Sequence, residues 1–230
     1  MAVSYVALLS GGLDSTVAAF AARRQGPVGI ALVFDYGQRA AKAEADAAKK
    51  IAKRLKAECR LIKLPFLAQV TKTALVMNDQ VIPQIKMAKL DDRSETEKSA
   101  QDVWVPNRNG LFLNIAACVA EGEGFSEIVV GFNAEEAATF PDNSANFVER
   151  SERCFELSTL GKIKICAPTL GLNKTEIVKL GMELDVPYGD VYSCYQGKKR
   201  HCGRCESCLR SMRAYQNAGL WPLLKNRFGA

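Results

Sequence analysis

The chain lacks several features that mark membrane, secreted and nucleic-acid-binding proteins. No apolar run approaches the roughly 20 residues that a bilayer-spanning helix needs, so we expect no membrane partner. The N-terminus has neither a basic flank nor a cleavage site, which predicts a cytoplasmic protein. The net charge of +6 is spread over 230 residues without a block of like charge. It suits an anionic small-molecule substrate as well as RNA, and we expect no nucleic-acid partner.

The glycine-lysine nucleotide loop, G-x-x-x-x-G-K-[ST], is also absent, but another anion-binding turn is present. The sequence Ser-Gly-Gly-Leu-Asp-Ser-Thr at residues 10–16 follows an apolar run that predicts a strand and precedes residues 17–22, which predict a helix. Backbone N–H groups in such a turn converge on one point, and glycines let the backbone approach a phosphate. The pattern resembles the PP-loop of ATP pyrophosphatases, and this implies an ATP site formed by Leu9, Ser10, Gly11, Gly12, Leu13, Asp14, Ser15, Thr16, Val17, Ala18 and Ala19.

Alternating strand and helix patterns predict an α/β protein with an open, mostly parallel sheet and helices on both faces. Further strands are predicted at residues 28–34, 60–64, 126–131 and 163–168. The polar segments that follow these strands are expected at one sheet edge, where such sheets bind ligands. We expect this domain to span residues 1–190. Residues 71–104 interrupt the alternation and predict a lid or mobile insertion of weak order, with a disordered surface excursion as the alternative.

Eight cysteines divide into two groups. Cys194, Cys202, Cys205 and Cys208 crowd near the C-terminus, in a spacing whose thiolates can converge on one tetrahedral ion. We predict a structural zinc site in a small C-terminal segment, residues 191–230. An iron-sulfur cluster is the rival, and His201 is the alternative fourth ligand. The remaining cysteines at positions 59, 118, 154 and 166 are expected to be small core residues.

Several motifs occur in the order found in one enzyme family. They are YGQR at 36–39, VPNRN at 105–109, GFNAE at 131–135, PD at 141–142, SCY at 193–195 and CGRCESC at 202–208. With the turn at 10–16, they resemble the 7-cyano-7-deazaguanine synthase (QueC) family of PP-loop ATP pyrophosphatases over nearly the whole chain. The resemblance implies a Rossmann-like, adenine nucleotide alpha hydrolase-like fold.

The resemblance also implies an activity and a set of site residues. The chain would be an ATP-dependent carbon-nitrogen ligase that converts 7-carboxy-7-deazaguanine and ammonia to 7-cyano-7-deazaguanine through adenylated intermediates and an amide, in queuosine and archaeosine precursor synthesis. ATP, Mg²⁺ and structural Zn²⁺ would be needed, and relatives suggest a homodimer. Catalytic roles fall to Asp14, Arg108 and Lys174, and substrate contacts to Arg39, Asn107, Arg108, Asn133, Glu135 and Asp142.

Purely structural roles remain open as alternatives for these residues. Asp14 could position Mg²⁺ or only the loop, Asn133 and Glu135 could cap a helix, and Arg39, Arg108 and Lys174 could form surface ion pairs. Tyr195 could stack on a base or only pack.

Three other functions are weighed against this one. Asn143-Ser144 replaces the Cys-Arg that commonly follows the PD motif, so a diverged enzyme that adenylates another carboxylate is one alternative. A tRNA-thiolating PP-loop ATPase is the second, and it would need a reactive cysteine or a redox cluster. The third is a nucleic-acid-binding zinc ribbon on an inert scaffold, which would bind RNA or DNA in a salt-dependent way.

Overall fold

The computed structural model describes residues 3–161 and 163–229. Five parallel strands form one sheet in the order β3-β2-β1-β4-β5. Their bounds are Tyr5–Leu8 for β1, Val28–Asp35 for β2, Glu58–Lys63 for β3, Glu127–Val129 for β4 and Lys164–Cys166 for β5. The chain builds outward from β1 through β2 to β3 and then returns to the other side of β1. The strand order therefore switches at the carboxyl ends of β1 and β4, where open α/β sheets bind ligands.

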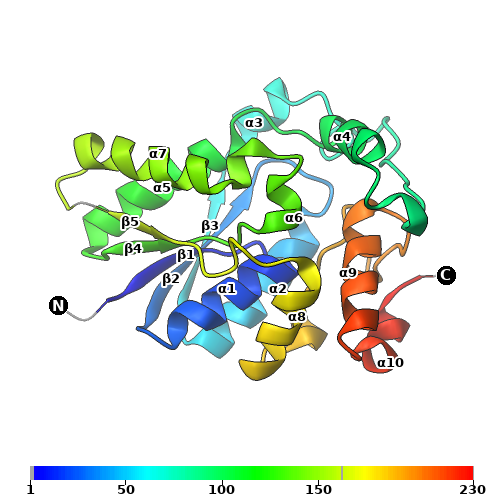
Figure 1. Ribbon diagram of the computed structural model, residues 1–230. Helices are drawn as coiled ribbons and strands as arrows, with labels where there is room; N and C mark the ends of the chain where they lie inside the picture. The colour runs from blue at the N-terminus through cyan, green and yellow to red at the C-terminus, as the bar shows by residue number, and fades with distance from the viewer. Residues whose placement is uncertain (1–2, 162, 230) are drawn as a thin grey trace.

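Helices cover both faces of this sheet (Figure 1). On one face lie α1 (Leu13–Arg23), α2 (Ala41–Leu55) and α8 (Lys174–Glu183), and on the other lie α5 (Arg108–Glu123) and α7 (Ala145–Ser158). The predicted fold class is confirmed. No helix among residues 3–161 and 163–229 is long and apolar enough to cross a membrane.

Small residues let the helices approach the sheet closely. In α2 the buried side chains recur at helical spacing on the face towards the sheet; they are Ala47, Ala48, Ile51, Ala52 and Leu55. Gly131, just after β4, lies so close to α1 that a Cβ there would stand 2.5 Å from the backbone nitrogen of Ser15. This contact fixes the start of α1 against the end of β4.

The segment 71–104 is more regular than the sequence predicted. It follows α3 (Pro65–Val70) and contains the 3₁₀ turn η1 (Met87–Lys89) and helix α4 (Arg93–Asp102). Asp92 caps α4 by accepting a hydrogen bond from the backbone N–H of Ser94, at 3.2 Å. The dense charge that predicted weak order instead forms pairs along a helix, as between Arg93 and Glu97 at 2.7 Å. Whether the segment acts as a lid remains a prediction.

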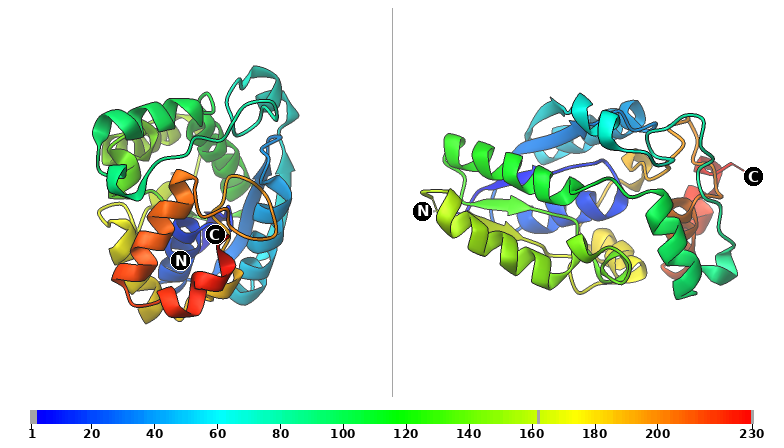
Figure 2. Two further views of the ribbon diagram at one scale, coloured as in Figure 1. Left: turned by 90° about the vertical axis from the view of Figure 1, so that its right-hand side faces the viewer. Right: turned by 90° about the horizontal axis from the view of Figure 1, so that it is seen from above.

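The C-terminal segment lies at the end of the molecule towards which the strands run. Helices α9 (Glu206–Asn217) and α10 (Trp221–Leu224) are seen there in Figure 1 and face the viewer in the left view of Figure 2. The backbone N–H of Tyr192 donates to the carbonyl of Gly11 at 2.8 Å, so this segment packs directly on the turn at 10–16. The remaining short elements are α6 (Ala134–Ala137), η2 (Pro141–Asn143), η3 (Tyr188–Asp190) and η4 (Lys225–Arg227).

Candidate functional site

The turn between β1 and α1 presents free backbone donors. Gly11 has φ +76°, in the region that favours glycine, and a Cβ there would meet the backbone nitrogen of Ala48 at 2.7 Å. The N-cap Gly12 offers no side-chain cap to α1. Within the described chain, the backbone N–H groups of Asp14 and Ser15 find no acceptor. Donors of this kind at a helix N-terminus bind anions.

The turn lines a cavity of about 250 Å³ at the carboxyl ends of β1, β2 and β4. The turn forms one wall. Tyr36 and Glu44 reach the cavity from the β2–α2 connection and α2, Arg108 from the start of α5, and Lys174 from the start of α8. The volume is close to the lower end of the range typical of small-molecule sites.

Lys174 is held between two carboxylates beside the turn. Its Nζ lies 2.5 Å from Oδ2 of Asp14 and 2.9 Å from Oε1 of Glu136, and its side chain is only 9% exposed. Burial raises the pKa of Asp14 despite the opposing charge of Lys174. Burial also acts to raise the pKa of Glu136, but Lys174 and Arg210 outweigh it, so that pKa lies below its ordinary value. The other oxygen of Asp14, Oδ1, is buried and has no hydrogen-bond partner among residues 3–161 and 163–229.

Arg108 also lines the cavity, from the first position of α5. Its Nη1 donates to the hydroxyl of Tyr36 at 3.2 Å. Asn107 precedes it with φ +49° and turns the chain into the helix, without lining the cavity. Asp142 does not line the cavity either, and its carbonyl accepts a bond from Nδ2 of Asn109 at 3.3 Å. Of the predicted substrate residues Asn107, Arg108 and Asp142, the structure brings only Arg108 to the cavity.

Asn133, which follows β4, caps a helix, as one of its two predicted roles requires, and contact with the substrate stays a prediction. Its Oδ1 caps α6 by accepting from the backbone N–H of Glu136 at 3.0 Å. The residue also lines the cavity, and its Nδ2 is buried and has no hydrogen-bond partner among the described residues. A buried donor without a partner is what a ligand acceptor would satisfy.

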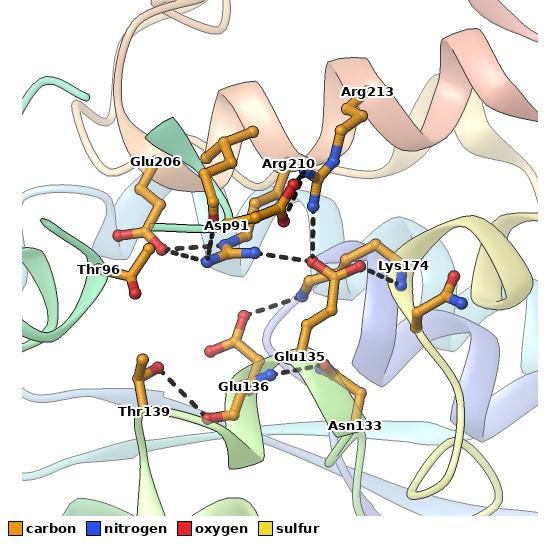
Figure 3. A network of polar contacts seen from close by, with 12 residues as sticks. Asp91, Thr96, Asn133, Glu135, Glu136, Thr139, Lys174, Glu206, Arg210 and Arg213 are labelled. Carbon is orange, nitrogen blue, oxygen red and sulfur yellow. Dashed lines mark hydrogen bonds and ion pairs between the residues drawn. The ribbon is translucent and has the colours of Figure 1, made fainter. Parts of the chain in front are cut away.

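Glu135 faces away from the cavity into a polar network that joins α6, α8 and α9 (Figure 3). Its Oε1 accepts from the backbone N–H of Lys174 at 2.9 Å, and its Oε2 accepts from Arg210 at 2.8 Å and Arg213 at 3.3 Å. Arg213 also pairs with Asp91 in the segment 71–104. Glu135 therefore positions the backbone of Lys174 and couples the C-terminal segment to the site.

Arg39 is also directed away from the cavity. Its Nη2 donates to the carbonyls of Met77 and Gln80, and its backbone N–H donates to the carbonyl of Leu75 at 2.8 Å. It does not line the cavity. The structure thus places Arg39 as the anchor of the segment that follows α3.

The residues predicted to bind ATP fall into two sets. The first set lines the cavity and consists of Leu9, Ser10, Gly12, Leu13, Asp14 and Ser15; Gly11 does not line it. Thr16 and residues 17–19 have no exposed surface and pack in the core of α1, behind the turn. The structure does not bring these four to the cavity, because the helix turns them towards the sheet.

Sequence reasoning missed several residues that line the cavity: Tyr36, Gln38, Glu44, Phe112 and Glu136. Tyr36 and Gln38 lie in a motif that was recognised, directly after a predicted strand. Glu44 stands in the first turn of the following helix, which could have signalled a carboxylate at the ligand edge. For the adjacent Glu135 and Glu136, the sequence cannot tell which one faces the cavity.

The four C-terminal cysteines converge. Their sulfur atoms all lie within 4.8 Å of one another, and those of Cys202 and Cys208 are 3.8 Å apart. A tetrahedron with Zn–S bonds of about 2.3 Å has edges of about 3.8 Å. Backbone N–H groups donate to two of the sulfurs: those of Gln196 and Cys202 to Cys194, and that of Cys205 to Cys202. Such donors favour thiolates, so these residues fit a metal ion.

His201 lies outside this cluster. Its Nε2 accepts a hydrogen bond from the backbone N–H of Ser193 at 3.2 Å, and its ring packs between Tyr192 and Phe228. Burial lowers the pKa of His201 to about 4. The residue is therefore a neutral part of the core beside the cluster.

The expectation for the other four cysteines is wrong. Cys59, Cys118 and Cys154 are exposed, and Cys166 is half-buried. Their apolar neighbours in sequence predicted burial, but strand β3 is an edge strand, and residues 118 and 154 lie on the outer sides of their helices. No cysteine is among the described residues that line the cavity.

Comparison with known proteins gives matches along nearly the whole chain. The family model described as queuosine biosynthesis protein QueC matches residues 4–219. A 7-cyano-7-deazaguanine synthase from Pelotomaculum thermopropionicum is 49% identical over 215 residues, which cover 94% of this chain and 97% of that protein. One from Methanosarcina mazei is 44% identical over 227 residues, covering 97% and 98%. Among solved structures, an NMN synthetase from Francisella tularensis shares 16% identity at a TM-score of 0.46, covering 98% of this chain and 86% of that one.

Proposed function

The chain belongs to the family of queuosine biosynthesis protein QueC, and from this we propose that it converts 7-carboxy-7-deazaguanine and ammonia to 7-cyano-7-deazaguanine with ATP. Relatives at 42–49% identity that carry the name 7-cyano-7-deazaguanine synthase support the proposal. The observation that carries it is the convergence of the free amides of Asp14 and Ser15 with Lys174 and Arg108 on one cavity.

The chemistry requires activation of a carboxylate. A carboxylate oxygen attacks the α-phosphorus of ATP, the bond to the β-phosphate breaks, and pyrophosphate leaves. Ammonia then adds to the carbonyl carbon of the mixed anhydride and expels AMP, which leaves the amide. A second ATP activates the amide oxygen in the same way, and loss of AMP and protons gives the nitrile. The protein's task is to position these groups and stabilise phosphate charge.

The cavity supplies residues for each part of that task. The amides of Asp14 and Ser15 would hold the pyrophosphate portion of ATP, with Lys174 and Arg108 as cations around it. Oδ1 of Asp14, buried without a partner, is an oxygen ligand of the kind that Mg²⁺ takes. That ion would neutralise phosphate charge. Nδ2 of Asn133 would donate to an acceptor on the ligand.

For the cysteine cluster we propose structural zinc. The 3.8 Å edge between Cys202 and Cys208 supports a single ion, because an iron-sulfur cluster holds several irons and sulfides between its thiolates and needs them farther apart. The segment that contains the cluster also contacts the turn at 10–16, since Ser193 Oγ accepts from the backbone N–H of Leu13 at 3.3 Å. Zinc would therefore support the ATP site through the backbone.

The identity of the carboxylate substrate is tested by incubating the purified, metal-loaded protein with ATP, ammonium and 7-carboxy-7-deazaguanine and analysing the products by mass spectrometry. We expect the amide and then the nitrile, with AMP and pyrophosphate as co-products. Absence of both products from a folded sample would refute the substrate assignment. If the protein instead forms AMP with a different carboxylate as substrate, it is a diverged enzyme of the family. Asn143, which replaces a common cysteine, lines the cavity and could account for such a change of substrate.

Two further parts of the proposal concern the assembly and the compartment. A homodimer is supported by the resemblance to relatives, and the apolar Leu223 in α10, which is 77% exposed, is available for such a contact. Light scattering across a concentration series tests it. We also retain the cytoplasm as the expected compartment.

A further inference from the structure

Glu44 is an acidic side chain in the cavity that the adenylation chemistry does not use. It stands in the first turn of α2, lines the cavity and is half-buried. No lysine or arginine in the described chain forms an ion pair with it. Burial raises the pKa of Glu44, although the hydrogen bond from Gln38 and the charge of Arg108 oppose this, so donors on a bound ligand would stabilise the carboxylate.

The carboxylate of Glu44 is held in one orientation. Its Oε2 accepts from Nε2 of Gln38 at 2.9 Å. Gln38 is 5% exposed and is itself fixed, because its Oε1 accepts from the backbone N–H of Tyr36 at 2.9 Å and its Nε2 also donates to the carbonyl of Phe34 at 3.0 Å. The second oxygen of Glu44, Oε1, accepts no hydrogen bond from the described residues and is not fully buried. The site therefore offers oriented acceptors rather than a flexible charge.

An aromatic wall stands beside this carboxylate. The ring of Phe112 stacks on that of Phe34 with centroids 3.9 Å apart and planes 7° apart, and it lies 5.9 Å from the ring of Tyr36. All three side chains line the cavity. Flat heterocycles pack well against such surfaces.

The acceptor pattern distinguishes the two heterocycles of the proposed reaction. An ionised carboxylate only accepts hydrogen bonds. A guanine-type ring presents two adjacent donors, the ring N1–H and the 2-amino group. Adenine presents one donor, its 6-amino group, next to an acceptor nitrogen, which a carboxylate oxygen would repel.

We infer that Glu44, oriented by Gln38, recognises the N1–H and 2-amino edge of the deazaguanine ring and thereby selects the acceptor substrate. This inference rests on the proposed function. Glu44 is then a specificity residue, and the adenine of ATP binds elsewhere along the cavity. The recognition would reject rings that lack the 2-amino group, because a buried acceptor would be left unpaired.

The test compares ring binding in the wild type and in Glu44→Gln. By calorimetry, the wild type is expected to bind 7-carboxy-7-deazaguanine roughly 10- to 100-fold more tightly than the analogue without the 2-amino group. In Glu44→Gln this preference should fall to a few-fold, while the Kd of an ATP analogue stays within about 2-fold. Asp46→Asn, an exposed carboxylate on the same helix, is the matched control and should retain the full preference.

Two results would overturn the inference. One is an unchanged ring preference in Glu44→Gln, and the other is weakened ATP binding with the ring preference intact, which would assign Glu44 to adenine. If Glu44→Gln does not fold by circular dichroism, Glu44→Asp is measured with the same readings. The two failures are distinguishable. The proposed function fails if the wild type forms neither amide nor nitrile, whereas the inference fails on the binding measurements alone.

Discussion

Replacing Lys174 with Met should damage both the fold and the site. Lys174 Nζ lies within 2.9 Å of two carboxylates, and its side chain is 9% exposed. Removing one partner of a buried ion pair costs about 3–5 kcal/mol, because the remaining charge stays buried and uncompensated. At about 2–4 °C per kcal/mol for a chain of this size, Tm should fall by about 6–20 °C. Turnover should fall as well, since a cation beside the phosphate site is lost.

The loss of stability should depend on pH with a definite sign. In the wild type the pKa of Glu136 lies below its ordinary value of 4.5, so its stabilising contribution is present at neutral pH and is lost as pH falls through the lowered pKa. In Lys174→Met the pKa of Glu136 should rise above its unfolded value, and the pKa of Asp14, which burial already raises in the wild type, should rise further. Each then destabilises the variant as pH rises through the raised pKa. The difference in Tm between wild type and variant should therefore be largest near neutral pH and shrink towards about pH 5.

Scanning calorimetry of the wild type and of Lys174→Met, near neutral pH and at about pH 5, measures this difference in Tm. Lys42→Met is the matched control, because the Lys42 side chain is 88% exposed and pairs with the exposed Asp46. Its stability should change by no more than about 0.5 kcal/mol. A Tm difference for Lys174→Met that is within 2 °C, or that is the same at both pH values, would refute the reasoning (about 2 °C corresponds to less than 1 kcal/mol).

Four further outcomes follow from the packing. Gly131→Ala should lower stability by about 1–3 kcal/mol and weaken ATP binding, because its Cβ would lie 2.5 Å from the backbone nitrogen of Ser15; calorimetry and nucleotide titration measure this. Gly122→Ala, in the open part of α5, should instead raise stability by about 0.5–1 kcal/mol in the same scan. Arg39→Ala should speed tryptic cleavage within residues 71–90, and unchanged cleavage would contradict its anchoring role. Cys202→Ser should lose the metal by elemental analysis while His201→Asn retains about one zinc per chain; the opposite pattern would reassign the ligands.

The sequence predicts the strands β1, β2 and β4 well because they are largely buried and read as continuous apolar runs, whereas the edge strands β3 and β5 are partly exposed. The turn at 10–16 and the cysteine spacing are local patterns, so their geometry follows from a few neighbouring residues. The capping box at the start of α8 is another such pattern. The Asn173 side chain accepts from the backbone N–H of Glu176 at 3.0 Å, and the Glu176 carboxylate accepts from the backbone N–H of Asn173 at 2.8 Å.

The direction of individual side chains is harder to predict, because it depends on segments far apart in the chain. Arg39 was expected at the substrate, yet its guanidinium is taken by backbone carbonyls about 40 residues later. Glu135 was expected there too, but Arg210 and Arg213 draw it towards α9 while its neighbour Glu136 turns to Lys174. No local rule decides which of two adjacent carboxylates meets which cation.

The central claim is that a carboxylate oxygen attacks the α-phosphorus of ATP bound at the turn between β1 and α1. Substrate labelled with ¹⁸O in the 7-carboxylate, incubated with ATP and ammonium, tests it by mass spectrometry of the released nucleotide. The account predicts AMP that carries one ¹⁸O in its phosphate. Unlabelled AMP, or label in inorganic phosphate with ADP as the nucleotide product, would contradict it.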